Sequence, residues 1–146
     1  MDESTRIFRG LHQGGIPRQG GWLHHHGFAT LVLAAEEEQP PADRFPGVRV
    51  VRFPLDDDLV PWSRPQLAAL RRLTVELARE VRLDRRVLVT CQMGLNRSGL
   101  IVAATLMRLT GATADEVIGL VRARRDPWAL SNPVFEELLR GPVSQW

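Results

Sequence analysis

The sequence contains no lysine, so all 19 positions counted as lysine or arginine are arginine. Because arginine stays charged to very high pH, this composition explains an isoelectric point near 9.8 beside a net charge of only +2. The chain also has no run of five or more basic residues. The high isoelectric point is therefore weak support for nucleic-acid binding, and we expect no nucleic-acid partner.

Cysteine is almost absent too: Cys91 is the only one. An intramolecular disulfide is therefore impossible, and a free thiol indicates a reducing compartment. The first ten residues are polar and acidic, and no apolar run approaches the 18 residues of a membrane helix. We expect a cytoplasmic protein with no membrane partner.

The length of 146 residues suits a single domain over 1–146, and we expect a monomer. Three β-branched or apolar runs predict strands, and four segments with helical spacing of apolar residues or clear capping residues predict helices. Strands come early and helices become continuous late, which favours an α/β fold with a small, mostly parallel central sheet and helices on both faces. The predicted strands are 28–34, 48–53 and 85–91, and the predicted helices are 64–83, 97–111, 113–125 and 131–140.

The junction between one strand and one helix carries the chemistry. The stretch "VLVTCQMGLNRSGLIVAA" places Cys91 at the end of a buried strand, and Arg97 and Ser98 at the start of a buried helix. Amides at a helix N-terminus lack internal partners and attract anions, and a concave run of N–H groups binds phosphate. The same field favours a nucleophilic thiolate, and an arginine adds a planar fork for two phosphate oxygens. The junction therefore predicts an anion cradle with a nucleophile at its floor.

The pattern C-x5-R-S from Cys91 to Ser98 resembles the signature loop of cysteine-dependent protein phosphatases, and its setting is similar to the dual-specificity branch. The segments "IFRGLHQGG", "GFATLVLAAEEE" and "SNPVFEELL" are similar to further motifs of that family, although Leu138 stands where many members have glutamine. The resemblance implies a phosphatase fold over nearly the whole chain. It also implies a phosphorylated protein or small phosphoester as substrate, with no metal and no cofactor.

The resemblance further implies a general acid on a loop upstream of the cysteine. The segment "VVRFPLDDDLVP" lies at that place, and its spacing of Pro54, Leu55 and Pro61 selects Asp57, with Asp58 and then Asp56 as alternatives. In the implied mechanism Cys91 attacks phosphorus while the aspartate protonates the leaving group, and water then hydrolyses the phosphocysteine. Ser98 would donate a hydrogen bond to the departing thiolate. The implied substrate-binding residues are Gln92, Met93, Gly94, Leu95, Asn96 and Arg97.

One position departs from the family pattern: Thr90 stands where most members have a histidine that orders the loop and activates the thiol. This keeps open an alternative in which the chain binds phosphorylated partners without turnover. A second alternative is a phosphatase of RNA 5′ ends, because "GLNRSG" is similar to the loop of those enzymes. A sulfurtransferase of the rhodanese type fits less well, since its active loop closes on fewer residues.

Three other features have simpler interpretations. The run His24–His26 is not a predicted metal site, because consecutive side chains diverge and no further ligand cluster is evident. The run "RARRD" at 122–126 suits the C-terminal end of a helix and can line the rim of the pocket. Trp62 and Trp128 lie in loops that can approach the site, and packing is the default interpretation for both.

Overall fold

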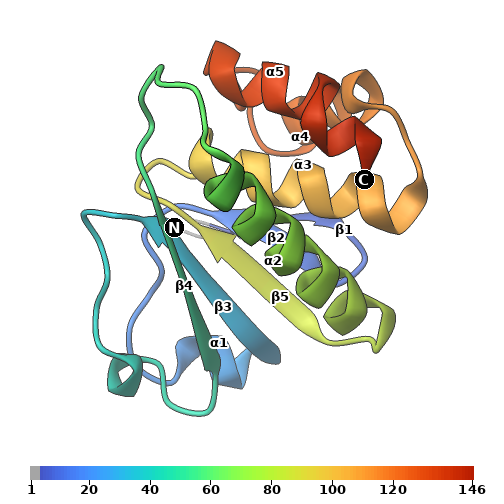
Figure 1. The fold of residues 1–146 in the computed structure, drawn as a ribbon. Coiled ribbons are helices and arrows are strands. Elements are labelled where there is room, and N and C mark those ends of the chain that lie inside the picture. The colour runs from blue at the N-terminus through green and yellow to red at the C-terminus, as the bar shows by residue number, and fades with distance from the viewer. Residues whose placement is uncertain (1–3) are drawn as a thin grey trace.

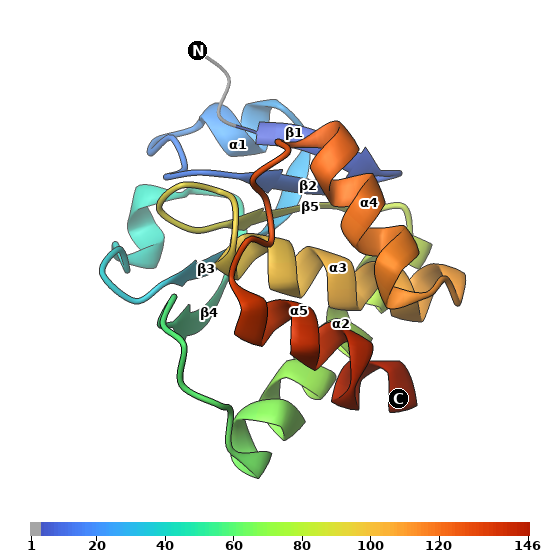
Figure 2. The same ribbon diagram turned by 90° about the horizontal axis from the view of Figure 1, so that it is seen from above.

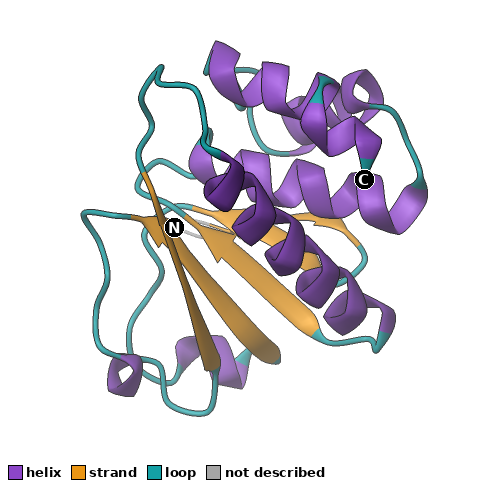
Figure 3. Cartoon of the chain, in the orientation of Figure 1, coloured by secondary structure: helices purple, strands orange, loops and turns teal. Residues whose placement is uncertain are grey.

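A five-stranded mixed sheet forms the centre of the molecule in the computed structural model, which describes residues 4–146 (Figures 1 and 3). The order across the sheet is β1-β2-β5-β3-β4. Pairings β2–β5, β5–β3 and β3–β4 are parallel, and only the edge pair β1–β2 is antiparallel. The predicted mostly parallel sheet is confirmed. The strands are β1 (Ser4–Phe8), β2 (Leu11–Gly14), β3 (Phe28–Ala35), β4 (Arg49–Leu55) and β5 (Arg86–Thr90).

Helices cover both faces of the sheet, but unequally. The four longer helices gather on one face, and α1 with the short 3₁₀ turn at 42–44 lies on the other (Figures 1 and 2). Each face has its own buried apolar cluster, as expected for a central sheet whose strands are apolar on both sides. The helices are α1 (Trp22–His25), α2 (Arg64–Arg82), α3 (Arg97–Thr110), α4 (Ala114–Arg124) and α5 (Pro133–Arg140).

The helix boundaries follow the capping residues in the sequence. Ser63 forms a capping box with Gln66 at the start of α2, and Thr113 forms another with Glu116 at the start of α4. Gly111 ends α3 in the left-handed conformation with φ +71°, which a glycine adopts without strain. These caps satisfy amides and carbonyls that would otherwise lack partners, so the helices start and stop where the sequence predicts.

The parallel strands bring three polar segments to one edge of the sheet. Chain segments that leave the carboxyl ends of parallel strands lie together, and open α/β sheets place their functional sites there. The loop after β3 carries Glu36 and Glu37, the loop after β4 carries residues 56–58, and Cys91 follows β5. In Figure 2 the loops after β4 and β5 lie at the same end of α3. The candidate site lies at this edge.

Candidate active site

Cys91 lies at the floor of the loop that joins β5 to α3. Its side chain is only 4% exposed, and its backbone N–H donates to the carbonyl of Gly14 at 3.2 Å. The Cys91 Sγ lies 3.2 Å from the hydroxyl oxygen of Ser98, which is itself fully buried in the first turn of α3. The thiol and the hydroxyl are therefore in contact, in the geometry that lets Ser98 donate a hydrogen bond to a thiolate.

The loop between Cys91 and Arg97 has the form of an anion cradle. Among the described residues, no acceptor takes the backbone N–H groups of residues 92–96, whereas carbonyls of the same loop accept hydrogen bonds from its surroundings. Gly94 has φ +71°, and a Cβ there would lie 2.6 Å from the Gly14 carbonyl carbon. Only glycine fits such a position. The loop is thus held from outside by its carbonyls and leaves its N–H groups for a ligand.

Arg97 is fixed along one edge of its guanidinium group. Its Nη1 and Nη2 donate to the two carboxylate oxygens of Glu37 at 2.7 and 2.5 Å, and Nη1 also donates to the carbonyl of Leu55 at 3.1 Å. A guanidinium has five N–H groups, so the Nε–H and one Nη2–H remain for a second planar partner. The Arg97 hydrogen bonds hold the pKa of Glu37 below its usual range. Glu37 therefore positions Arg97 with a free edge that suits two phosphate oxygens.

Of the three candidate acids, Asp57 is the one in contact with the signature loop. Its Oδ2 accepts from the side-chain amide of Asn96 at 3.0 Å, and its Oδ1 accepts from Asn132 at 2.8 Å. Asp58 instead accepts from the backbone of Val60 within its own turn. Asp57 thus stands at the mouth of the cradle, fixed by one amide from the loop and one from the N-cap of α5.

Asp56 faces the loop after β3 and does not contact the signature loop. A hydrogen bond with Asp56 is the main cause that raises the pKa of Glu36; burial and the charges of Asp56 and Glu37 raise it further, and the charge of Arg97 opposes them. These carboxyls border a hollow of about 310 Å³ under the loop after β4. No basic side chain lines that hollow: its walls are Glu36, Pro54, Leu55, Asp56, Asp58, Val60, Pro61, Trp62 and Gln66.

Among the described residues, the Thr90 side chain forms no hydrogen bond with the loop. Its hydroxyl donates to the carbonyl of Val32 on β3 at 2.9 Å, and the residue is 1% exposed. The hydroxyl therefore forms its hydrogen bond within the sheet. Thr90 does not supply the loop-ordering contact that the resemblance implies for a histidine at this position.

Three side chains at the site were not predicted as functional from the sequence. Glu37 and Asn132 lie in the segments "GFATLVLAAEEE" and "SNPVFEELL", and neither residue was given an individual role at the site; in the structure Asn132 caps α5, where its Oδ1 accepts from Val134 N. Gln13 on β2 was not singled out at all. It is fully buried, and its Nε2 donates to Gly94 O at 3.0 Å and to Ser98 Oγ at 3.3 Å. Its buried Oε1 has no partner among the described residues, which costs about 1–3 kcal/mol.

The arginine-rich end of α4 also reaches the site. Arg125 Nε donates to the carbonyl of Gly94 at 3.1 Å. Arg122 instead holds the following loop through the carbonyls of Ala129 and Leu130 at 2.9 Å each. The prediction that this run ends a helix and borders the pocket agrees with these contacts. Of the two tryptophans, Trp62 packs edge-on against Phe135, whereas Trp128 is 73% exposed.

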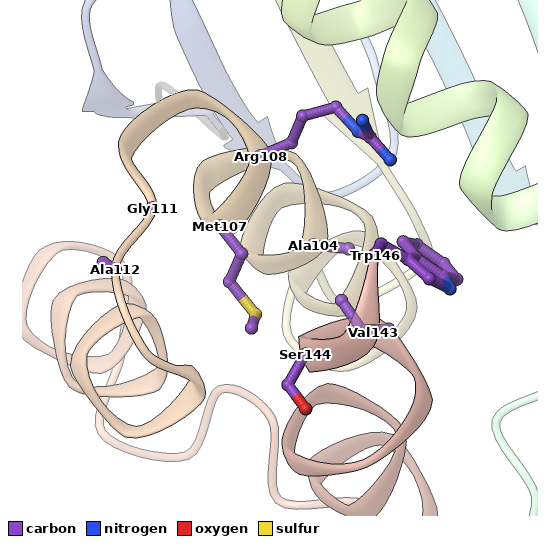
Figure 4. Close-up of a pocket in the computed structure, with 8 residues that line it drawn as sticks. All are labelled: Ala104, Met107, Arg108, Gly111, Ala112, Val143, Ser144 and Trp146. Atoms are coloured by element: carbon purple, nitrogen blue, oxygen red, sulfur yellow. The ribbon is translucent and has the colours of Figure 1, made fainter.

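A separate cavity of about 320 Å³ lies at the other end of α3, beside the C-terminal 3₁₀ turn at 142–145 (Figure 4). It has no thiol and no carboxylate side chain in its wall, so it lacks the groups of the site above. Within residues 4–146, no group of three His, Cys, Asp or Glu side chains is arranged to hold a metal ion. None of the helices described combines the length and the apolar character needed to cross a membrane. The cavity is lined by Ala104, Met107, Arg108, Gly111, Ala112, Val143, Ser144 and Trp146.

Comparison with known proteins identifies the family of the chain and agrees with its fold. The sequence model of the family described as "Dual specificity phosphatase, catalytic domain" matches residues 23–141. The chain therefore belongs to the dual-specificity branch of the cysteine-dependent phosphatases. No curated protein sequence matches it.

Solved structures give the same result for the fold. Human DUSP28 is 26% identical, with a TM-score of 0.82 over 99% of this chain and 95% of that one. A mouse putative dual specificity phosphatase, complexed with zinc tungstate, is 28% identical, with a TM-score of 0.83 over 98% of this chain and 87% of that one. Tk-PTP in its active form is 24% identical, with a TM-score of 0.81 over 98% of this chain and 97% of that one, and this likeness concerns the fold alone.

Proposed function

We propose that the chain hydrolyses phosphoesters of proteins through a phosphocysteine intermediate. The Cys91 thiolate attacks phosphorus and forms the S–P bond while the P–O bond to the leaving group breaks. Asp57 gives its proton to that leaving oxygen, and then, as a carboxylate, takes a proton from the water that attacks the phosphocysteine. Hydrolysis returns the thiolate, to which Ser98 donates a hydrogen bond. Arg97 and the amides of residues 92–96 hold the charge on the three equatorial oxygens.

One observation carries this proposal: a nucleophile and an acid meet at the same anion cradle. The Cys91 Sγ is 3.2 Å from Ser98 Oγ at the floor, and Asp57 Oδ2 is 3.0 Å from Asn96 Nδ2 at the mouth. A phosphoester whose phosphate fills the cradle would present its bridging oxygen toward the mouth. The nucleophile and the acid would then lie on opposite sides of the scissile bond, as in-line displacement requires.

The rim of the site supports a protein substrate over a phosphoinositide. Large apolar side chains are exposed on loops that contact the signature loop or belong to it: Ile16, Leu59, Val60, Met93 and Trp128. The neighbouring hollow carries Glu36, Asp56 and Asp58 without a basic residue. Beside Arg125, which contacts the loop at Gly94 O, these apolar and acidic groups suit peptide side chains next to a phosphorylated residue, and the acidic hollow would repel an anionic membrane surface.

Asn96 is the residue of the loop that suggested an RNA 5′ phosphatase. Its contacts support a different role, which is to hold the general acid. Its amide donates to Asp57, and its Oδ1 accepts from Ser131 Oγ at 3.3 Å and from Asn132 N at 3.2 Å. These contacts join the signature loop to the acid and to the start of α5, so they favour acid-assisted hydrolysis. The feature that favours a binding protein without turnover is Thr90, because its hydroxyl donates to Val32 O of β3 and not to the signature loop.

One set of assays separates these functions. Steady-state turnover of p-nitrophenyl phosphate, phosphotyrosine and phosphothreonine peptides, and a 5′-triphosphorylated oligonucleotide should be measured with a chelator present. We expect turnover of the first three and little of the last. Binding of tungstate or phosphopeptide with no turnover would instead support the binding function, and preferential release of phosphate from RNA would support the second alternative.

The ion pair of Arg97 with Glu37 gives a prediction with a defined pH dependence. We expect Glu37→Gln to lower kcat/KM about tenfold at pH 6–7, mainly through KM, because the guanidinium loses its fixed orientation. The folded-state pKa of Glu37 lies below its unfolded value, so its contribution to stability is present above about pH 4.5 and is lost as pH falls through the folded pKa. The difference in Tm between wild type and variant should therefore shrink below about pH 4.

Thermal unfolding from pH 3 to 7 and steady-state kinetics measure these effects, with Glu38→Gln as the matched control. Unchanged KM in Glu37→Gln, or a Tm difference that grows toward low pH, would contradict the assigned ion pair.

Asn132 has two roles, since it holds Asp57 and caps α5, and substitutions can separate them. Asn132→Asp keeps an oxygen that caps α5 at Val134 N, but it replaces the amide that holds Asp57 with a carboxylate. We expect a near-normal Tm and a fall in kcat of about tenfold or more on alkyl phosphates, which depend on the acid most. Asn132→Ala should lose both roles and about 1 kcal/mol of stability. Wild-type kcat in Asn132→Asp, with the losses confined to Asn132→Ala, would show that the cap alone matters.

A further inference from the structure

Gln13 is a polar residue at a buried strand position, where an apolar side chain is the usual choice. It lies on β2 beside Val89 of β5, is fully buried, and is 85 positions from Ser98 in the sequence. Its side chain reaches under the signature loop, where Nε2 lies 3.0 Å from Gly94 O and 3.3 Å from Ser98 Oγ. The amide therefore contacts both the loop and the hydroxyl that faces the Cys91 sulfur.

The chemistry of these partners fixes the direction of each hydrogen bond. A backbone carbonyl only accepts, so Gly94 O requires the NH₂ end of Gln13 to face the loop. The second hydrogen of that NH₂ group points to Ser98 Oγ, which accepts it. The Ser98 proton is then free to point at Cys91 Sγ, 3.2 Å away. When Cys91 is a thiolate, the three groups form a chain in which Gln13 donates to Ser98 and Ser98 donates to the sulfur.

We propose that Gln13 is a positioning residue for the Cys91 thiolate, acting through Ser98 and through Gly94 of the loop. It supplies the ordering contact that Thr90 does not make, since the Thr90 hydroxyl donates to Val32 O. The catalytic consequence rests on the proposed function. The effect on the thiol itself does not, because thiolate reactivity is measurable without any substrate.

A role in packing alone does not account for this residue. Gln13 Oε1 is buried without a partner among the described residues, so the glutamine leaves a polar group unsatisfied. Gly94 O has a second donor in Arg125 Nε at 3.1 Å, so loss of Gln13 would not orphan that carbonyl. A leucine of similar volume would remove the unpaired oxygen and keep the core filled. We therefore expect Gln13→Leu to keep or raise Tm while it weakens the thiolate.

The direct test is the rate of Cys91 alkylation by iodoacetamide as a function of pH. The chain has a single cysteine, so intact mass reports this thiol alone. For Gln13→Leu we expect the pH of half-maximal rate to rise by about half to one unit, the effect of weakening one oriented hydrogen bond to the thiolate. Thr90→Val is the matched control, because the Thr90 hydroxyl donates to Val32 O within the sheet. This variant should not shift the pH dependence of the alkylation rate. Gln13→Met serves as a second variant if the leucine variant does not fold.

A double-mutant cycle tests the path through Ser98. If Gln13 acts through that hydroxyl, Gln13→Leu should have little further effect on the alkylation profile in a Ser98→Ala background. On p-nitrophenyl phosphate, Gln13→Leu should lower kcat several-fold with KM unchanged. An unshifted profile in folded Gln13→Leu, or fully additive shifts in the double variant, would overturn the proposal. A wild type that alkylates as expected but does not turn over would refute the proposed function and leave this inference testable.

Discussion

Replacing Cys91 with serine is expected to lower kcat on p-nitrophenyl phosphate by on the order of 10⁴-fold or more. A serine hydroxyl at this position is a poor nucleophile, since among the described residues the only side chain that forms a hydrogen bond with the Cys91 sulfur is the Ser98 hydroxyl at 3.2 Å, which is not a base. The cradle amides and Arg97 remain in place, so the variant should still bind phosphate analogues. Steady-state turnover and tungstate binding by calorimetry measure the two properties separately.

The control for this variant is its fold. Cys91 is buried among apolar neighbours and its replacement by serine changes little volume, so Tm should stay close to that of wild type. Substantial turnover in folded Cys91→Ser would contradict a cysteine mechanism altogether.

Replacing Asp57 with asparagine should give the second largest effect, and the size should depend on the leaving group. On alkyl phosphates and phosphothreonine peptides we expect kcat to fall about 10²- to 10⁴-fold, because the departing alkoxide needs a proton. On p-nitrophenyl phosphate the loss should be smaller, since nitrophenolate leaves without one. The steepness of kcat against leaving-group basicity is the quantity to measure.

Asp58→Asn and Asp56→Asn are the matched controls, because they carry the same change one residue away on the same loop. Their carboxylates face Val60 N and Glu36, so each should retain most of the activity on every leaving group. If Asp58→Asn shows the steep dependence and Asp57→Asn does not, the acid is assigned to the wrong residue.

The architecture was predictable because its signals are local in sequence. Apolar runs marked β3, β4 and β5, and the caps Ser63 and Thr113 marked the starts of α2 and α4. The pair Cys91 and Ser98 was predictable for the same reason, since a strand, a loop and a helix within one stretch determine their contact.

The supporting contacts were not predictable, because each joins residues far apart in the chain. Arg97 meets Glu37 across 60 positions, Asp57 meets Asn132 across 75, and Gln13 meets Ser98 across 85. No local pattern marks such partners. A polar residue at a strand position that should be apolar was the one available signal for Gln13. Likewise, the sequence showed that Thr90 replaces histidine, but not that its hydroxyl turns to β3.

The most direct measurement of the central claim is the mass of the protein quenched in acid during turnover of p-nitrophenyl phosphate. The proposed mechanism predicts one added phosphoryl group, located on the peptide that contains Cys91 and absent in Cys91→Ser. Turnover that proceeds with no phosphoryl group on that peptide, under conditions where product formation shows an initial burst, would contradict the mechanism.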